Sequence, residues 1–128
     1  MQEAAELTAA AMMSEARRLV ISGWCQGAHA RDRGGLEVPS WSEEARSWSL
    51  LGALLSSWHH QDAQRNADVG AHLADAHALG EATEVLGEVV GTAALDRWND
   101  AATRTKKDVV AAMDGALVAL NGSSSKSS

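Results

Sequence analysis

The sequence predicts an all-α protein, a compact bundle of about five helices with one irregular or short β-hairpin insertion at residues 24–39. Apolar residues recur at three- and four-residue spacing through most of the chain, which places them on one face of a helix. Glycines and capping-type residues separate these stretches. The helical period stops over residues 24–39, where Arg31-Asp32-Arg33-Gly34-Gly35 is typical of a turn.

Two helices are predicted in the first half of the chain. The first covers residues 3–22 and ends at Gly23, a common C-terminal stop. The second begins at Ser40 and Glu43, which have the spacing of a capping box, and runs to about Trp58. Its apolar face contains Trp41, Ala45, Trp48, Leu51, Leu55 and Trp58. A face this wide predicts a central, largely buried helix.

Three further elements follow before residue 100. A helix over residues 63–79 is expected to end at Gly80, and a shorter one covers residues 81–90. Residues 93–98 form a last short element. Whether these two short elements are one kinked helix or two is open, although Thr92 as an N-cap favours two.

The chain ends in one more helix and a polar tail. Thr105 and Asp108 have capping-box spacing and begin the last helix. We therefore expect one helical domain over residues 1–120. Residues 121–128 are rich in serine and lack apolar side chains to bury, so we expect a disordered tail there.

Composition limits the classes of function. The 128-residue chain has a formal charge of −6, and residues 41–100 hold three basic against ten acidic side chains. Such a surface repels phosphate backbones, so we expect no nucleic-acid partner. With Cys25 as the single cysteine, no internal disulfide can form, which favours the cytoplasm. Residues 1–22 carry acidic side chains and resemble neither a signal peptide nor a membrane anchor, so no membrane association is expected.

Several motifs occur together in a fixed order. They are Trp24-Cys25-Gln26-Gly27-Ala28, Ala30-Arg31-Asp32, Trp48-Ser49-Leu50-Leu51-Gly52-Ala53-Leu54, Trp98-Asn99-Asp100, and Arg104-Thr105 with Val109. In this order they resemble an uncharacterised family of small helical proteins from bacteria and their phages, over roughly residues 12–120. The resemblance implies that the first, second and fourth motifs belong together, and it implies no activity. Ser49 departs from the family, which often has cysteine at that position.

One polar and aromatic set lies in two loops that can converge at one end of the bundle. Its members are Trp24, Gln26, Arg31, Asp32, Trp98, Asn99 and Asp100. A cation, carboxylates and amides between two tryptophans suit a small polar ligand or a peptide. The alternative is a structural clasp, in which Arg31 pairs with Asp100 or Asp32 and the amides hold loop backbone.

Two further groups of residues are weaker candidates for a catalytic site and a metal site. Cys25 and His29 are four residues apart and resemble a thiolate and its base, although a lone cysteine is more often a small buried apolar residue. Asp68, His72 and Asp75 have helical spacing that lets them approach one cation such as zinc or manganese. The alternative for this trio is a solvated acidic helix face.

A third weak candidate is a basic group of residues that can bind an anion. Arg104, Thr105 and Lys106 stand at the start of the last helix, where cations oppose the helix dipole and can mark an anion site. Solvated cations beside a normal helix cap are the alternative.

Taken together, these patterns favour a small cytoplasmic, non-catalytic binding or protein-interaction module. Its partner is expected to be a protein or a small polar ligand, with a homodimer as a further option, and no cofactor is expected. A small metal- or thiol-dependent hydrolase is the first alternative. A DNA-binding regulator is the second, and the negative charge disfavours it.

Overall fold

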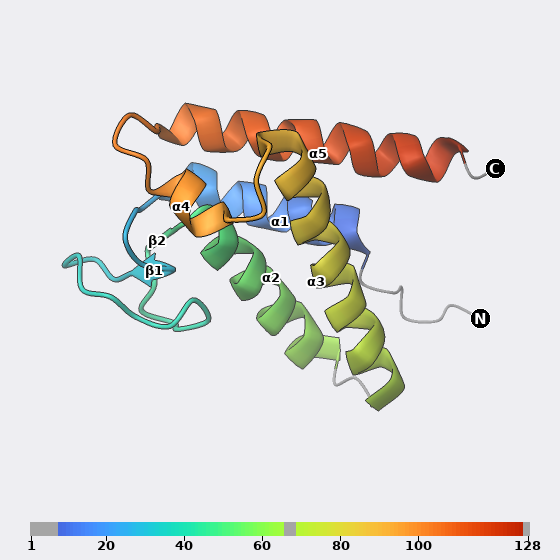
Figure 1. The fold of residues 1–128 in the computed structure, drawn as a ribbon. Helices are drawn as coiled ribbons and strands as arrows, with labels where there is room; N and C mark the ends of the chain where they lie inside the picture. Colours follow the sequence, from blue (N-terminus) through green and yellow to red (C-terminus); the bar gives the residue numbers. More distant parts are fainter. Residues whose placement is uncertain (1–7, 66–68, 127–128) are drawn as a thin grey trace.

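The computed structural model describes residues 8–65 and 69–126 of the chain (Figure 1). Within these ranges the elements are α1 (Ala9–Ser22), β1 (Ala30–Arg31), β2 (Ser47–Trp48), α2 (Leu50–Arg65), α3 (Val69–Val90), α4 (Leu95–Asn99) and α5 (Lys106–Lys126). The predicted helical bundle with a short hairpin is confirmed.

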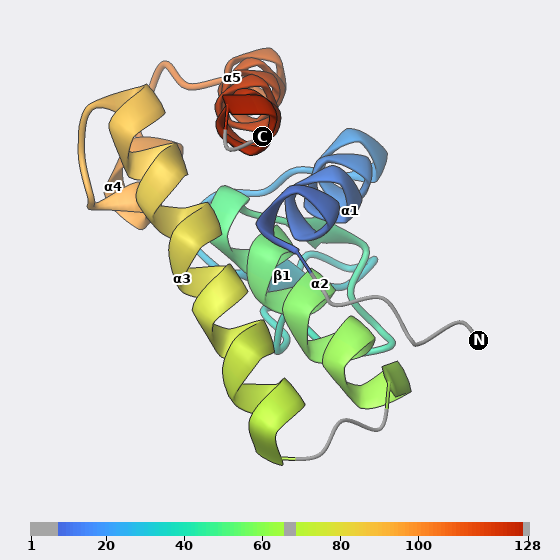
Figure 2. The same cartoon turned by 90° about the vertical axis from the view of Figure 1, so that its right-hand side faces the viewer.

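The helices share one hydrophobic core. Helices α2 and α3 lie side by side, and α1 packs against both, while α5 crosses over α1 and α3 (Figure 2). Side chains with no exposed surface come from α1, α2, α3 and α5, and α4 adds Leu95. They include Met12, Met13, Leu54, Leu86 and Met113. Each helix therefore buries one apolar face, as the three- and four-residue spacing predicts.

Helix α1 ends where the sequence predicts, and Gly23 permits a close approach of two backbones. The Thr8 hydroxyl accepts a hydrogen bond from the Ala11 N–H and caps the helix start, 3.0 Å away. A Cβ atom at Gly23 would lie 2.3 Å from the carbonyl oxygen of Arg46. The predicted first turns at residues 3–7 lie outside the described part of the chain.

The predicted start of the second helix at Ser40 is wrong. Trp48 belongs to β2, which pairs antiparallel with β1, and α2 begins only at Leu50. The Trp48 N–H donates to the Gly23 carbonyl at 2.9 Å, so its backbone is held by a distant segment rather than by a helix. The Ser49 hydroxyl caps α2 instead, accepting from the Gly52 N–H at 3.0 Å. Backbone hydrogen bonds to segments distant in sequence therefore prevail over the local capping pattern at Ser40 and Glu43. As a result, the irregular insertion extends beyond Pro39.

The predicted helix end at Gly80 is also wrong. Helix α3 continues through Gly80 because Ala78, Ala82 and Leu86 keep one buried face in register on both sides of it. A glycine inside a helix costs only about 1 kcal/mol, less than this packing contributes. The break falls at Gly91, whose φ of +85° ends α3 and makes α4 a separate helix.

The last helix begins as predicted and extends further. The Thr105 N–H donates to the Asp108 carboxylate at 3.1 Å, and the Asp108 N–H donates to the Thr105 hydroxyl at 3.2 Å, which forms a capping box. The helix continues to Lys126, whereas the sequence predicts disorder from residue 121. The expected disordered tail stays a prediction. Residues 127–128 lie outside the described ranges.

None of the helices in residues 8–65 and 69–126 is long and apolar enough to cross a membrane.

Candidate functional site

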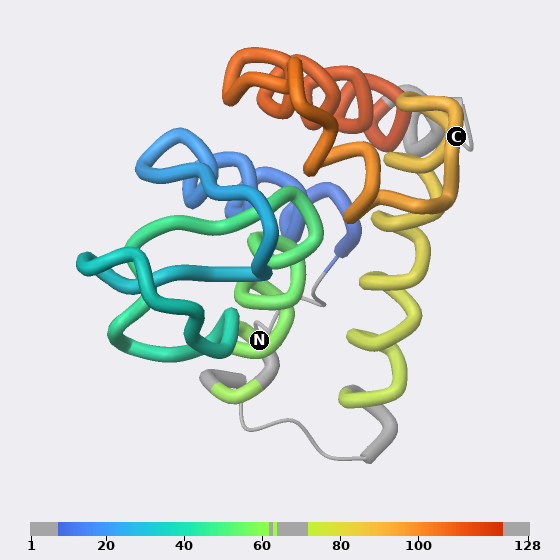
Figure 3. Tube along the Cα trace, turned by 60° about the vertical axis from the view of Figure 1, so that its left-hand side comes forward, coloured from blue at the N-terminus to red at the C-terminus, as the bar shows by residue number. Residues whose placement is uncertain are grey.

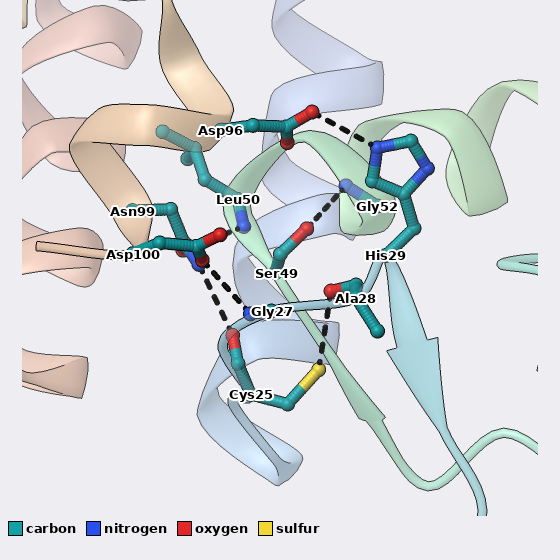
Figure 4. Close-up of polar contacts among 10 residues, drawn as sticks. All are labelled: Cys25, Gly27, Ala28, His29, Ser49, Leu50, Gly52, Asp96, Asn99 and Asp100. Atoms are coloured by element: carbon teal, nitrogen blue, oxygen red, sulfur yellow. Dashed lines mark hydrogen bonds and ion pairs between the residues drawn. The ribbon is translucent and has the colours of Figure 1, made fainter. Parts of the chain in front are cut away.

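The segments between α1 and α2 gather on one side of the helices, beside α4 and the start of α2 (Figure 3). Four of the seven predicted site residues meet there: Trp24, Gln26, Asn99 and Asp100. We call these four residues, with the backbone of Cys25, Gly27 and Leu50, the Asn99 clasp. Figure 4 shows the part of it formed by Asn99, Asp100, Cys25, Gly27 and Leu50.

The Asn99 side chain is fully buried and uses all of its hydrogen-bonding capacity. Its oxygen accepts from the Trp24 indole N–H at 2.8 Å and from the Leu50 N–H at 3.0 Å. Its amide nitrogen donates to the Cys25 carbonyl at 3.1 Å and to the Asp100 carboxylate at 2.9 Å. A side-chain amide offers two donors and an acceptor oxygen with two lone pairs, so no capacity is left for a ligand.

Gln26 and Asp100 tie the same two segments together from the outside. The Gln26 amide donates to the carbonyls of Asn99 at 2.9 Å and Ala101 at 3.0 Å. The Asp100 carboxylate accepts from the Gly27 N–H at 3.0 Å. Gly27 has a φ of +80°, which glycine adopts without strain. These residues therefore hold the loop after α1 against the end of α4.

Arg31 and Asp32 lie in the same loop but act on its own backbone. The Arg31 guanidinium donates to the Gln26 carbonyl through Nε at 3.3 Å and Nη2 at 3.0 Å, and to the Gly35 carbonyl at 3.0 Å. Asp32 accepts from the Leu36 N–H at 2.9 Å. The structural alternative pairs Arg31 with Asp32 or Asp100, whereas the hydrogen bonds of its guanidinium go to carbonyl oxygens.

Trp98 contacts Arg104, one of the three predicted anion residues. The Arg104 guanidinium lies 3.8 Å from the centre of the Trp98 ring, and its Nε donates to the Trp98 carbonyl at 2.9 Å. Lys106 donates to the Ile21 carbonyl at 2.8 Å, and Thr105 takes part in the capping box. These cationic and hydroxyl groups thus have partners within the chain. The anion site stays a prediction.

Cys25 and His29 do not face one another as a thiolate and its base would. Cys25 is buried, its thiol donates to the Ala28 carbonyl at 3.6 Å, and burial raises its pKa. His29 contacts the carboxylate of Asp96 through Nε2 at 3.2 Å (Figure 4). A thiol with a raised pKa is a poor nucleophile at neutral pH.

The predicted metal trio is only partly described. Asp68 lies outside the described residues. His72 is exposed, and its ring centre lies 5.8 Å from that of Trp58, whereas Asp75 is buried. Among the residues that the structure describes, no group of three or more His, Cys, Asp or Glu side chains can hold a metal ion. The trio itself stays a prediction.

A hollow of about 210 Å³ lies on the Asn99 clasp. It is lined by Gly27, Ala28, His29, Glu37, Asp96 and Asp100, and we call it the acidic hollow. Asp100 belongs to both the clasp and the hollow, so the clasp fixes one wall of it. Sequence reasoning missed Asp96 and Glu37. The available signal was that Asp96 precedes Asn99 by three residues and Asp100 by four, at the end of a short helical stretch.

A second hollow of about 390 Å³ continues from the first. The two share His29 and Glu37, and the second adds Val38, Pro39, Ser40, Trp41 and Leu55. We call it the apolar hollow. It was missed because Ser40 and Trp41 were assigned to a helix that begins later.

A larger hollow of about 780 Å³ lies between α1 and α2, away from the clasp. Its charged lining residues are Glu15 and Arg18, which form an ion pair with each other. Gln61 donates to the Ser57 hydroxyl at 2.8 Å, and Ser57 donates to the Met12 carbonyl at 3.2 Å. The Glu15, Arg18, Ser57 and Gln61 side chains thus have partners within the chain. This hollow therefore presents fewer unpaired charged groups to a ligand than the acidic hollow does.

The fold and the clasp are those of a small helical protein in which hydrogen bonds of side-chain amides hold α4 against the loop after α1. This chain belongs to a family of unknown function, DUF6197, whose family model matches residues 4–118. The expected membership in an uncharacterised family is confirmed. No curated protein matches the chain. No solved structure matches it.

Proposed function

We propose that this protein is a non-catalytic binding module and that the acidic hollow holds a positively charged group of its ligand. The observation that carries the proposal is the placement of three carboxylates, those of Glu37, Asp96 and Asp100, around one hollow beside a hydrogen-bonded clasp. Concave sites with a few fixed polar groups are typical of ligand binding. A cation is the complementary group, because three exposed carboxylates around one hollow create a negative potential that attracts it.

The clasp supports binding rather than catalysis. Its amides and the Arg31 guanidinium are engaged with backbone groups, so they hold the loop in place and are not available to a substrate. A loop fixed in this way loses little conformational entropy when a ligand binds. The pKa of Cys25, raised by burial, argues against a thiol-dependent hydrolase.

The wider setting follows from charge and cysteine content. A formal charge of −6 favours a cationic partner and disfavours nucleic acid. The lone buried Cys25 is compatible with a reducing cytoplasm, where we place the protein. The ligand is then a protein segment or a small polar molecule that carries an amine or a guanidinium group.

The proposal is tested by titrating the protein with N-acetylarginine amide and recording backbone amide chemical shifts. We expect concentration-dependent shifts at Gly27, Ala28, His29, Glu37 and Asp96, with smaller changes elsewhere. N-acetylglutamine amide, which has no charge, serves as the control ligand and is expected to leave these signals in place. Equal shifts with both ligands, or shifts confined to another face of the bundle, would refute the proposal.

A further inference from the structure

We infer that the occupant of this surface is an extended segment of another protein, with a basic side chain and an apolar side chain two residues apart. The basic side chain enters the acidic hollow and the apolar one enters the apolar hollow. This inference rests on the proposed function and adds to it the second hollow, the backbone of the ligand and the role of Ser40.

The apolar hollow presents an anchoring aromatic side chain. Trp41 is half exposed, and its ring stacks on that of His59 with the ring centres 5.1 Å apart. Val38, Pro39 and Leu55 complete the apolar lining. A tryptophan held in position by a stacked neighbour provides a large contact area at small entropic cost, and such residues dominate binding energy at protein interfaces.

Ser40 supplies an independent sign of a missing partner. Its side chain is only 2% exposed, it lines the apolar hollow, and its hydroxyl has no hydrogen-bond partner among the described residues. Its backbone carbonyl is already used, because it accepts from the Trp48 indole N–H at 3.1 Å. Buried polar groups are nearly always paired in native proteins. An extended segment has free N–H and C=O groups along its backbone and can pair this hydroxyl once the Ser40 side chain rotates toward the hollow.

The continuity of the two hollows sets the spacing of the ligand. Because both linings include His29 and Glu37, the two hollows are neighbours, and one ligand can reach both across these two residues. In an extended chain, side chains two residues apart point in the same direction and lie about 7 Å from each other. When a basic residue lies beside Glu37 and Asp96, we assign the apolar residue two positions along, on the same side of the extended segment, to the hollow lined by Trp41.

Charge selects the kind of segment. Each copy of this chain has a formal charge of −6, so a second copy would bring further negative charge toward the carboxylates of the acidic hollow. A segment rich in lysine or arginine has the complementary sign. The occupant is therefore a basic segment of a different protein.

The probe for this inference is the peptide acetyl-Arg-Gly-Leu-Gly-Arg-Gly-Leu amide, in which basic and apolar side chains alternate on one face when the chain is extended. We expect amide shifts in both hollows and a shift of the Trp41 indole N–H. In one matched peptide glutamate replaces both arginines, and we expect its affinity to be at least about tenfold lower. In the other, serine replaces both leucines, and we expect the Trp41 shift to disappear while the shifts at Glu37 and Asp96 remain.

Ser40→Ala tests the role of the hydroxyl. If the peptide pairs this group, the variant binds the arginine peptide about fivefold more weakly. The free protein is expected to be at least as stable as wild type, because an unpaired buried hydroxyl has been removed. Ser42→Ala is the matched control, since the Ser42 hydroxyl accepts from the Glu44 N–H, and it is expected to leave affinity unchanged.

The results distinguish failure of the two-hollow inference from failure of the proposed function. Shifts confined to the acidic hollow, with Trp41 unmoved and Ser40→Ala binding like wild type, would overturn the two-hollow inference and leave the proposed function standing. Binding of N-acetylarginine amide with no gain in affinity for the peptide would have the same consequence. Equal binding of the glutamate peptide would instead overturn the preference for a cation, and with it both proposals.

Discussion

The Trp24 indole N–H and the Asn99 side-chain oxygen form a 2.8 Å hydrogen bond between residues 75 positions apart. The same oxygen accepts the N–H of Leu50, the first residue of α2. One buried atom therefore joins the loop after α1, the start of α2 and the end of α4. The acidic hollow stands on this junction, so its shape depends on Asn99 even though Asn99 does not line it.

Replacing Asn99 by alanine is expected to lower the free energy of unfolding by about 3 kcal/mol or more. The change leaves the Trp24 indole, the Leu50 N–H and the Cys25 carbonyl without their partner, and each unpaired buried group costs about 1–3 kcal/mol. Urea unfolding followed by circular dichroism measures the change. Asn121→Ala, at an exposed position of α5, is the control and should change stability by less than about 0.5 kcal/mol. A loss below about 1 kcal/mol at Asn99 would show that the clasp is not needed.

Arg31→Ala separates a structural from a ligand-binding role for the guanidinium. Because Arg31 bonds the carbonyls of Gln26 and Gly35, we expect a loss of about 1–3 kcal/mol of stability. Arg31→Lys should recover only part of it, since one ammonium group lacks the fork that reaches both carbonyls. Thermal unfolding of the two variants measures this order. A variant of wild-type stability that loses binding of N-acetylarginine amide would instead assign Arg31 to the ligand.

Two glycines within helices should respond in opposite directions to alanine. A Cβ at Gly52 would lie 1.9 Å from the His29 carbonyl oxygen, so Gly52→Ala must push the loop away from α2 and should lower stability by about 2 kcal/mol or more. No atom lies within 4 Å of a Cβ at Gly80, and Gly80→Ala should raise stability by up to about 1 kcal/mol. Chemical denaturation of both variants gives the comparison. A neutral Gly52→Ala would contradict the close contact of loop and helix.

The buried thiol of Cys25 should make stability fall at alkaline pH. Burial raises its pKa in the folded chain above the ordinary value of 9.0, so the unfolded chain loses this proton at a lower pH than the folded chain does. The contribution is complete below pH 9.0 and is lost as the pH rises through the folded-state pKa. Unfolding free energies measured from pH 7 to pH 10 should fall less steeply for Cys25→Ala. Iodoacetamide should also modify the folded protein more slowly than a free thiol. Identical slopes for the two proteins would contradict the assignment.

The sequence was sufficient for most of the helical framework and for part of the clasp. Apolar spacing predicted the buried faces of α1 and α5, because such spacing depends only on helix geometry. The position of Trp24, Gln26, Asn99 and Asp100 in two segments between predicted helices indicated that they can meet at one end of the bundle. It could not predict how the Asn99 amide is shared among three segments, since that depends on their arrangement in space.

The wrong helix boundaries and the missed hollows share a physical cause. In each case contacts between residues distant in sequence decide the structure. Ser40 and Glu43 carry a local helix-start pattern, but the backbone of Trp48 pairs with Gly23 and delays α2 to Leu50. Gly80 has the composition of a helix end, but buried residues on both sides of it carry α3 onward. Both hollows were missed for the same reason, because Glu37 and Asp96 lie far apart in sequence and meet only in the fold.

The most direct test of the binding site is the affinity of N-acetylarginine amide for two double variants with the same change in net charge. Glu37→Gln with Asp96→Asn removes two carboxylates of the acidic hollow, whereas Glu44→Gln with Glu81→Gln removes two exposed carboxylates that line neither of the hollows we have named. Dissociation constants from amide-shift titrations should rise about tenfold for the first pair and less than about twofold for the second. Equal weakening in both pairs, or none in the first, would contradict the claim that the acidic hollow is the binding site.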